Sequence, residues 1–178
     1  MMLLVLPNLY VTGTDDPEGD RTVQRFRVFD DGAWLAPYDT DAMCAAYVLD
    51  GYEDAHPRLR SASKLRPRMH WRIVDCDNPR HRPWDDWQHG LEVAREIARW
   101  LEPRPRIYVT RAGWRYVWRL DPPEEIGEEL AFLVSLHARG VPVDFACADW
   151  TRLYRMPRAT RDGELLPFVG EGFEDGTR

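Results

Sequence analysis

Two aspartates separated by one residue, Asp75 and Asp77, are the first residues in the sequence whose spacing suggests chemistry. They end an apolar run that predicts a strand, and residues i and i+2 of a strand point to the same face. Two carboxylates held this close repel each other, and a hard divalent cation with oxygen ligands is the usual way to neutralise them. Asp144 lies in a second apolar run and is the candidate third ligand. The alternative is structural: Asp77 with Asn78 and Pro79 ends the strand, and Asp75 is an exposed carboxylate.

Arginines follow the third aspartate. Arg152 and Arg155 come shortly after Asp144, and guanidinium groups beside carboxylates are the arrangement required where a metal ion and a polyphosphate share a pocket. Residues three apart lie on opposite faces of a strand, so at most one of the two arginines faces the site unless the chain bulges. A surface network of ion pairs is the alternative interpretation.

A third segment, residues 110–115, combines a hydroxyl group, a glycine and two guanidinium groups. Thr110 and Arg111 precede Gly113 in a predicted hairpin turn, and Arg115 follows it. Hydroxyl and guanidinium groups both donate hydrogen bonds to phosphate oxygens. These residues are therefore candidates for anion binding, and an ordinary hairpin with solvated arginines is the alternative.

In their order along the chain, these segments resemble the catalytic motifs of the archaeo-eukaryotic primase superfamily, in particular the primase-polymerases of phages and plasmids. The family's first motif is hhDhD or hhDhE. Its second has Ser or Thr, glycine and a histidine before an aromatic strand, and its third is hD followed by R-x-x-R-x-P or R-x-F-R-L-Y. The matching segments here are Val74-Asp75-Cys76-Asp77, residues 110–118, Val143-Asp144 and Arg152-Leu153-Tyr154-Arg155-Met156-Pro157. The resemblance covers about residues 64–163, and the chain departs from it at Arg115, where the family has histidine.

The resemblance implies template-directed nucleotidyl transfer on single-stranded DNA, by a DNA primase or DNA polymerase. It implies that Asp75, Asp77 and Asp144 hold two Mg²⁺ or Mn²⁺ ions ~3.5–4 Å apart, one activating the primer 3′-hydroxyl and one bridging the triphosphate of an NTP or dNTP. The residues it places at the nucleotide are Thr110, Arg111, Arg115, Arg152 and Arg155.

A basic loop, residues 56–69, is the expected contact with the template strand. Its basic residues are Arg58, Arg60, Lys64, Arg66 and Arg68. Primases of this type often act with a helicase or another replication protein, so the resemblance also implies a separate protein partner.

Arg115 keeps a second function open. An arginine can bind phosphate, but it cannot act as a neutral imidazole. The alternative is therefore a catalytically impaired, primase-like domain that binds nucleic acid as a replication accessory. A third hypothesis is a metal-dependent DxD glycosyltransferase, in which Asp75 and Asp77 hold a metal ion against a nucleotide sugar. That hypothesis leaves the arginines after Asp144 unexplained, and the chain is short for it.

The elements expected to position these residues follow from hydrophobic periodicity. Expected strands are residues 23–29, 71–77, 106–112, 115–120, 141–148 and 153–156, with a turn at 30–32 leading into 33–35. Expected helices run from Asp39 or Thr40 to about residue 49, cover residues 84–101, and extend from Pro122-Pro123 to Gly140. This order indicates an α+β domain with a mixed or antiparallel sheet and packed helices. The resemblance narrows it to an RRM-like primase catalytic core.

Length and composition indicate one domain, since the chain has 178 residues, of which 44% are hydrophobic and 30% are charged. We expect a single catalytic domain over residues 1–163, with an N-terminal hairpin and helix part (1–55) and a motif-bearing core (56–163). An acidic, flexible tail (164–178) follows. The three cysteines are widely spaced and form no CxxC pair, which favours the reducing cytoplasm over secretion. No apolar run approaches the ~18 residues of a membrane span.

The formal net charge of −6 hides an uneven distribution of charge. Residues 56–82 contain eight basic residues and only two acidic ones, and residues 104–119 and 150–161 contain arginines but no acid. A local positive field can attract an anion even when the whole protein is negative. The sequence therefore predicts a locally positive surface around the three aspartates.

Overall fold

The structure is a computed structural model that describes the motif-bearing part of the chain and four short strands before it. The described residues are 2–6, 27–30, 43–45, 47–48, 68–149, 152–157, 160–161 and 164–173.

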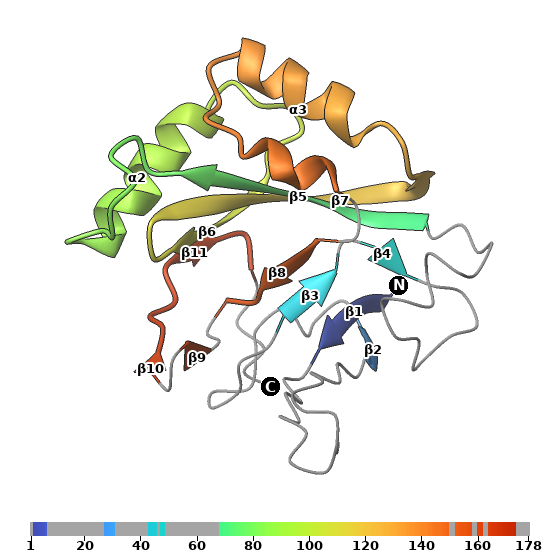
Figure 1. The fold of residues 1–178 in the computed structure, drawn as a ribbon, viewed down its shortest axis with the longest axis horizontal. Coiled ribbons are helices and arrows are strands. Elements are labelled where there is room, and N and C mark those ends of the chain that lie inside the picture. The colour runs from blue at the N-terminus through green and yellow to red at the C-terminus, as the bar shows by residue number, and fades with distance from the viewer. Residues whose placement is uncertain are drawn as a thin grey trace, which may run out of the picture.

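A five-stranded sheet forms the centre of the molecule, with the strand order β11-β6-β7-β5-β4 and antiparallel pairing throughout. Its strands are β4 (Tyr47–Val48), β5 (Arg68–Asp77), β6 (Arg106–Thr110), β7 (Gly113–Glu125) and β11 (Gly170–Glu171). The two α-helices of the described residues, α2 (Trp87–Ala98) and α3 (Glu129–Ala138), cover one face of this sheet (Figure 1). The chain is therefore α+β.

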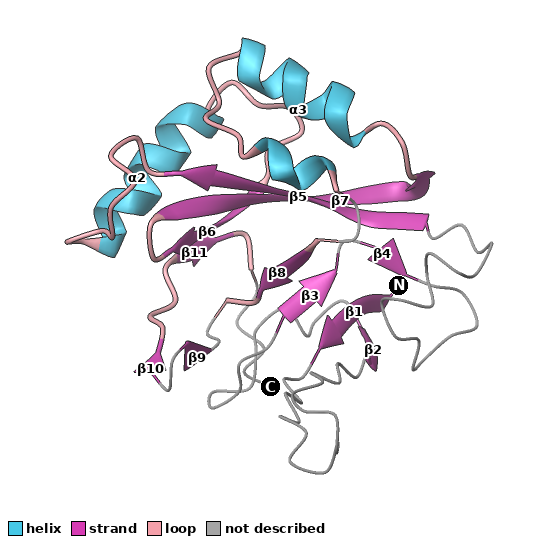
Figure 2. Cartoon of the chain, in the orientation of Figure 1, coloured by secondary structure: helices cyan, strands magenta, loops and turns pink. Residues whose placement is uncertain are grey.

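A second, four-stranded sheet lies on the other side of the five-stranded one (Figure 2). Its order is β2-β1-β3-β8, again with antiparallel pairs. The strands are β1 (Met2–Leu6), β2 (Arg27–Asp30), β3 (Met43–Ala45) and β8 (Leu153–Arg155), and a two-stranded hairpin of β9 (Thr160–Arg161) and β10 (Glu164–Leu165) follows β8. β8 comes directly after the segment that holds Asp144, so this second sheet positions the last predicted motif, residues 152–157, beside the central sheet.

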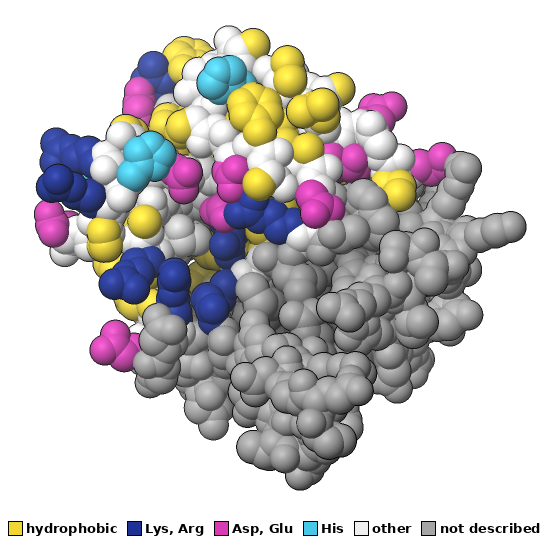
Figure 3. All heavy atoms as spheres, in the orientation of Figure 1, with side chains coloured by type: hydrophobic (Ala, Val, Ile, Leu, Met, Phe, Trp, Pro, Cys, Tyr) yellow, Lys and Arg dark blue, Asp and Glu magenta, His cyan; other side chains and the backbone are white. Residues whose placement is uncertain are grey.

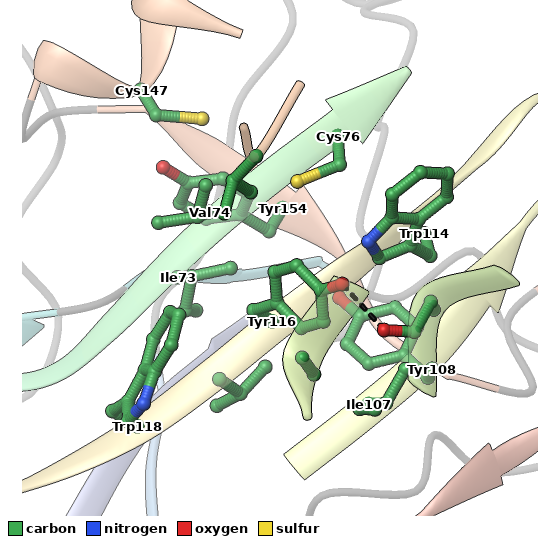
Figure 4. Close-up of a cluster of buried hydrophobic side chains, with 14 of the residues drawn as sticks. Ile73, Val74, Cys76, Ile107, Tyr108, Trp114, Tyr116, Trp118, Cys147 and Tyr154 are labelled. Atoms are coloured by element: carbon green, nitrogen blue, oxygen red, sulfur yellow. Dashed lines mark hydrogen bonds between the residues drawn. The ribbon is translucent and has the colours of Figure 1, made fainter. Parts of the chain in front are cut away.

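Side chains alternate between the two faces of β5 and β7, so one face packs in the core and the other carries charged groups. Cys76, Trp114 and Tyr116 belong to the helix side, where they join the buried core (Figure 4). The Tyr116 hydroxyl donates a 2.6 Å hydrogen bond to the backbone oxygen of Ala94 in α2. Asp75, one position before Cys76, consequently points to the opposite face, toward β8.

Several predicted elements are confirmed. The strand predicted over residues 71–77 is the second part of β5, and the hairpin predicted around residues 112–114 joins β6 to β7. The helix predicted over residues 84–101 is α2, which begins at Trp87 after its N-cap Asp86. These elements combine strong periodicity with a local stop signal.

The helix predicted from Asp39 or Thr40 to residue 49 is wrong. The described residues of this stretch form β3 and β4 instead, and β3 pairs with β1 on one side and β8 on the other. Partners far away in the sequence decide its conformation, and short apolar runs fit helix and strand periodicity alike. Of the strand predicted over residues 23–29, the described part belongs to β2, which extends to Asp30 and pairs with β1. Residues 33–35 lie outside the described part.

The start of the next predicted helix is also wrong. Pro122 and Pro123 do not open a helix but continue β7, and α3 begins only at Glu129. Opposite the prolines, the pairing of β5 with β7 shifts register between Met69 and Trp71. A proline cannot donate a ladder hydrogen bond, and an irregularity in the ladder is where a strand tolerates it. The predicted stop is confirmed, because Gly140 adopts φ of 85° after the helix.

One later prediction needs correction as well. Residues 141–148 do not form a strand: Val143 makes one isolated bridge to Cys76, and residues 145–148 form a 3₁₀ helix, η1 (Phe145–Ala148). In the segment predicted to be a tail from residue 164, β11 pairs with β6 and the Val109 N–H donates to the oxygen of Val169. Residues 174–178 lie outside the described part.

The helices of the described residues include none that is long and apolar enough to cross a membrane.

The close contact between the start of β7 and the end of β5 predicts a stability effect. A Cβ atom on Gly113 would lie 2.0 Å from the backbone oxygen of Cys76, so Gly113→Ala must push β7 away from β5. We expect Gly113→Ala to lower the free energy of unfolding by roughly 3 kcal/mol, as overpacking does. Urea denaturation measures this loss.

Gly127→Ala is the control, because a Cβ there meets nothing within 4 Å although φ is 132°. Backbone strain alone should cost it about 1 kcal/mol. Equal losses in the two variants would contradict the close approach at Gly113.

Candidate active site

A row of three polar side chains crosses the central sheet on the face opposite the helices. Asp75 of β5 lies opposite Arg115 of β7, and Arg115 lies opposite Tyr108 of β6. The Arg115 Nη2 atom is 3.2 Å from Asp75 Oδ2, and Nη1 donates to the Tyr108 hydroxyl at 3.1 Å. The register of three neighbouring strands therefore builds this part of the site.

The backbone of β5 also places Asp144. The N–H of Asp144 donates to the backbone oxygen of Asp75 at 2.8 Å, and the adjacent residues Val143 and Cys76 form a β-bridge. Asp144 then caps η1, since its Oδ1 accepts a 2.9 Å hydrogen bond from the N–H of Ala146. The structure thus brings together the first and third predicted motifs.

Arg152 joins the two carboxylates. Its Nη1 lies 2.7 Å from Asp144 Oδ2, and its Nη2 lies 3.3 Å from Asp75 Oδ2. Asp75 Oδ2 consequently accepts from two guanidinium groups, those of Arg115 and Arg152. Two carboxylates and two guanidiniums balance in formal charge, which is what allows half-buried acids to sit side by side.

Arg115 is the more deeply held of the two arginines. Its Nη1 donates to the backbone oxygen of Arg155 at 2.6 Å, and the Tyr108 hydroxyl donates to the same oxygen at 3.0 Å. Burial alone would lower the pKa of Arg115, but Asp75 and Tyr108 raise that pKa well above its ordinary value. Arg115 is therefore a permanent positive charge on the sheet.

An aromatic ring lies against both cations. Tyr154 of β8 has its ring centroid 5.5 Å from the Arg115 guanidinium carbon and 5.7 Å from that of Arg152. Burial raises the pKa of the Tyr154 hydroxyl well above its ordinary value, so the ring stays neutral. A neutral, electron-rich face of this kind stabilises a neighbouring cation.

Asp77 does not join this cluster. Its side chain is 59% exposed, and its ion-pair partner among the described residues is His81, 3.9 Å away. Asn78 ends the strand as expected, because its N–H donates to Ala112 and its side chain bonds to the backbone of Arg80 and Arg82. Within the described part of the chain, no group of three or more His, Cys, Asp or Glu side chains is placed to hold a metal ion.

A small cavity lined by arginines lies beside the carboxylates. Its volume is about 60 Å³, roughly one fifth of the lower end of the range typical of ligand pockets, ~300 Å³. The polar side chains that line it include Tyr108, Thr110, Arg111, Arg115, Arg155 and Arg161, and the apolar wall includes Trp87 and Phe168. Figure 3 shows arginine side chains gathered beside acidic ones on the displayed face.

Four of the five predicted nucleotide-binding residues line this cavity, namely Thr110, Arg111, Arg115 and Arg155. Arg152, the fifth, pairs with the carboxylates. Of the predicted template residues, Arg58, Arg60, Lys64 and Arg66 lie outside the described residues, and Arg68 is the first residue of β5 rather than part of a loop.

Sequence reasoning assigned no role to Tyr108, Tyr154 or Arg161. Tyr108 carries a signal, since it alternates with Thr110 in a predicted strand that pairs with the one holding Arg115. Arg161 closes the acid-free basic stretch that was identified by charge alone. The sequence around Tyr154 gives no such signal, because the contact of its ring with Arg115 depends on how β8 packs against the central sheet.

Comparisons of the chain with protein-family models, with curated proteins and with solved structures gave no match.

The environment of Asp144 predicts how stability depends on pH. Burial alone would raise the pKa of Asp144, but the Ala146 N–H and the Arg152 guanidinium outweigh it and lower that pKa below the ordinary value of 3.8. A carboxylate with a lowered folded-state pKa contributes stability above its unfolded pKa, and this contribution is lost as the pH falls through the folded pKa. We expect Asp144→Asn to lower the free energy of unfolding by about 1–2 kcal/mol at pH 7.

The difference in the free energy of unfolding between Asp144→Asn and the wild type should shrink as the pH falls below 3.8. Urea denaturation across the pH range measures this difference. Asp85→Asn is the matched control, because Asp85 is exposed and forms no ion pair with a described residue. A loss at Asp144 that stays constant at acid pH would contradict a role for its charge.

Proposed function

We propose that the chain is a template-directed nucleotidyltransferase of the primase-polymerase type, acting on single-stranded DNA. The observation that carries this proposal is the convergence of Asp75 and Asp144 on one guanidinium beside an arginine-lined cavity. Nucleotidyl transfer needs these two environments next to each other, since anionic ligands must hold the cations and cationic groups must hold the triphosphate.

The carboxylates are suited to a divalent cation. Asp75 and Asp144 present hard oxygen atoms that already converge on a positive group, Arg152. Mg²⁺ and Mn²⁺ favour such ligands. The resemblance adds Asp77, on the same face of β5 two residues from Asp75. When bound, two such ions would activate a primer 3′-hydroxyl and neutralise charge on the triphosphate.

The protein's own side chains would bind and orient the nucleotide. Arg111, Arg155 and Arg161 border the cavity and offer planar donors that match phosphate oxygens. Arg115 lines the same cavity while its Nη1 donates to the backbone oxygen of Arg155 and its Nη2 donates to Asp75. It can therefore place positive charge where the family has histidine, although it cannot transfer a proton near pH 7.

The fold is compatible with the rest of the proposal. The central antiparallel sheet with two helices on one face would correspond to the RRM-like core of the primase superfamily. A cytoplasmic location, expected from the three widely spaced cysteines, and a template contact through the basic residues 56–69 complete the proposal. A separate replication partner is added on the resemblance alone.

A non-catalytic replication accessory is the second candidate. The observation that favours it is that the carboxylates of Asp75 and Asp144 are both already paired with arginine. Under this alternative the cluster is structural, and its arginines bind the phosphates of single-stranded DNA.

A primer-extension assay separates the two functions. The protein is incubated with a primed or unprimed single-stranded template, labelled NTPs or dNTPs, and Mg²⁺ or Mn²⁺. We expect product from the wild type, and at least about 100-fold less from Asp75→Asn, because the variant removes a negative charge that would hold the metal ion. Asp85→Asn should keep wild-type activity.

Circular dichroism must show that Asp75→Asn is folded. Synthesis that persists in this variant would mean that the metal site is wrongly placed. Absence of product from the wild type with every metal and nucleotide, with DNA binding retained, would favour the accessory.

The arginine-lined cavity predicts a separate kinetic effect. Arg111→Gln removes a guanidinium that would donate hydrogen bonds to phosphate on the exposed side of the cavity. We therefore expect KM for the nucleotide to rise roughly tenfold, with kcat close to wild type. Arg104→Gln is the control, since Arg104 is also exposed but lies outside the cavity. Equal KM values for the two variants would place the triphosphate elsewhere.

A further inference from the structure

The two arginines at the carboxylates are held in different ways. Arg115 bonds to three acceptors on different strands, including a backbone oxygen and a tyrosine hydroxyl, and its side chain is 13% exposed. The Arg152 side chain is 27% exposed, and the acceptors of its guanidinium are the carboxylates of Asp75 and Asp144. Displacing Arg115 would leave buried groups unpaired, whereas Arg152 can leave toward solvent.

The atoms that Arg152 occupies are those that a metal ion would need. Its two nitrogens bind the Oδ2 atoms of Asp75 and Asp144, one nitrogen to each. A divalent cation shared by these two aspartates would draw on the same lone pairs. A guanidinium and a metal ion bear like charges, so the two cannot hold the same pair of oxygens at once.

We propose that Arg152 is a placeholder cation, which bridges Asp75 and Asp144 in the metal-free protein and is displaced when a divalent ion binds. This inference rests on the metal site of the proposed function. The bridge keeps the two carboxylates close together before the ion arrives, at the cost of competing with it. Arg115 stays in place and holds Asp75 in both states.

Direct measurement of Mn²⁺ binding tests this role without any need for activity. The electron paramagnetic resonance signal of free Mn²⁺ is followed during titration of the metal-free, full-length protein. Arg152→Gln removes the competitor, and we expect it to bind Mn²⁺ about tenfold more tightly than wild type. Arg152→Lys keeps the charge but has no planar fork to span both carboxylates, so we expect an increase of about threefold.

A control separates the bridge from general electrostatics. Arg111→Gln removes a positive charge from the neighbouring cavity without touching either carboxylate, and it should change Mn²⁺ affinity less than twofold. Thermal unfolding without metal checks that each variant folds, and the increase in Tm on adding Mn²⁺ should be larger for Arg152→Gln than for wild type.

The possible results distinguish this inference from the function on which it rests. Mn²⁺ binding that is lost in Asp144→Asn but unchanged in Arg152→Gln and Arg152→Lys would overturn the placeholder and leave the metal site intact. If Arg152→Lys bound Mn²⁺ with wild-type affinity while Arg152→Gln bound it more tightly, Arg152 would act only through its charge, and the bridge would be overturned. Absence of Mn²⁺ binding in every protein would overturn both the metal site and the placeholder.

Discussion

The sharing of one carboxylate oxygen, Asp75 Oδ2, by two guanidinium groups is the interaction on which the site depends. A half-buried carboxylate needs cationic or hydrogen-bonding partners, and here they come from β7 and from the segment before β8. Through Arg115 the carboxylate is tied to Tyr108 and to the backbone of β8. Through Arg152 it is tied to Asp144. The acidic and basic groups of the site therefore form one connected unit in which each charge is compensated.

The fold supports this unit by bringing backbones close together. Gly113 permits β7 to start directly against the end of β5, which sets the register that pairs Asp75 with Arg115. At the Cys76 end of β5, the β-bridge of Val143 brings Asp144 alongside the strand. The second sheet contributes β8, whose backbone accepts the hydrogen bond of Arg115. The helices pack on the opposite face and support the strands without touching these charges, as the position of Tyr116 against α2 shows.

Local patterns predicted much of this fold, and long-range pairing accounts for most of what they missed. Helix α2 and the β6–β7 hairpin carry strong periodicity and clear stop signals, so both were predictable. Residues 43–48 form strands only because of distant partners, and the place of Asp144 depends on one bridge to Cys76. Spacing suggested that Asp75 and Asp144 belong to one site. The spacing could not predict that Arg152 bridges the two carboxylates, because only the folded chain brings these atoms together.

Coupled binding of metal and nucleotide would show whether the carboxylates and the arginine-lined cavity form one site. Isothermal titration calorimetry would measure the affinity for a deoxynucleoside triphosphate with and without Mn²⁺, in the wild type and in Asp144→Asn. We expect Mn²⁺ to strengthen nucleotide binding at least about tenfold in the wild type but not in Asp144→Asn, because the two ligands meet at shared charges. Nucleotide affinity that is indifferent to Mn²⁺ in the wild type, or equally strengthened in both proteins, would contradict this expectation.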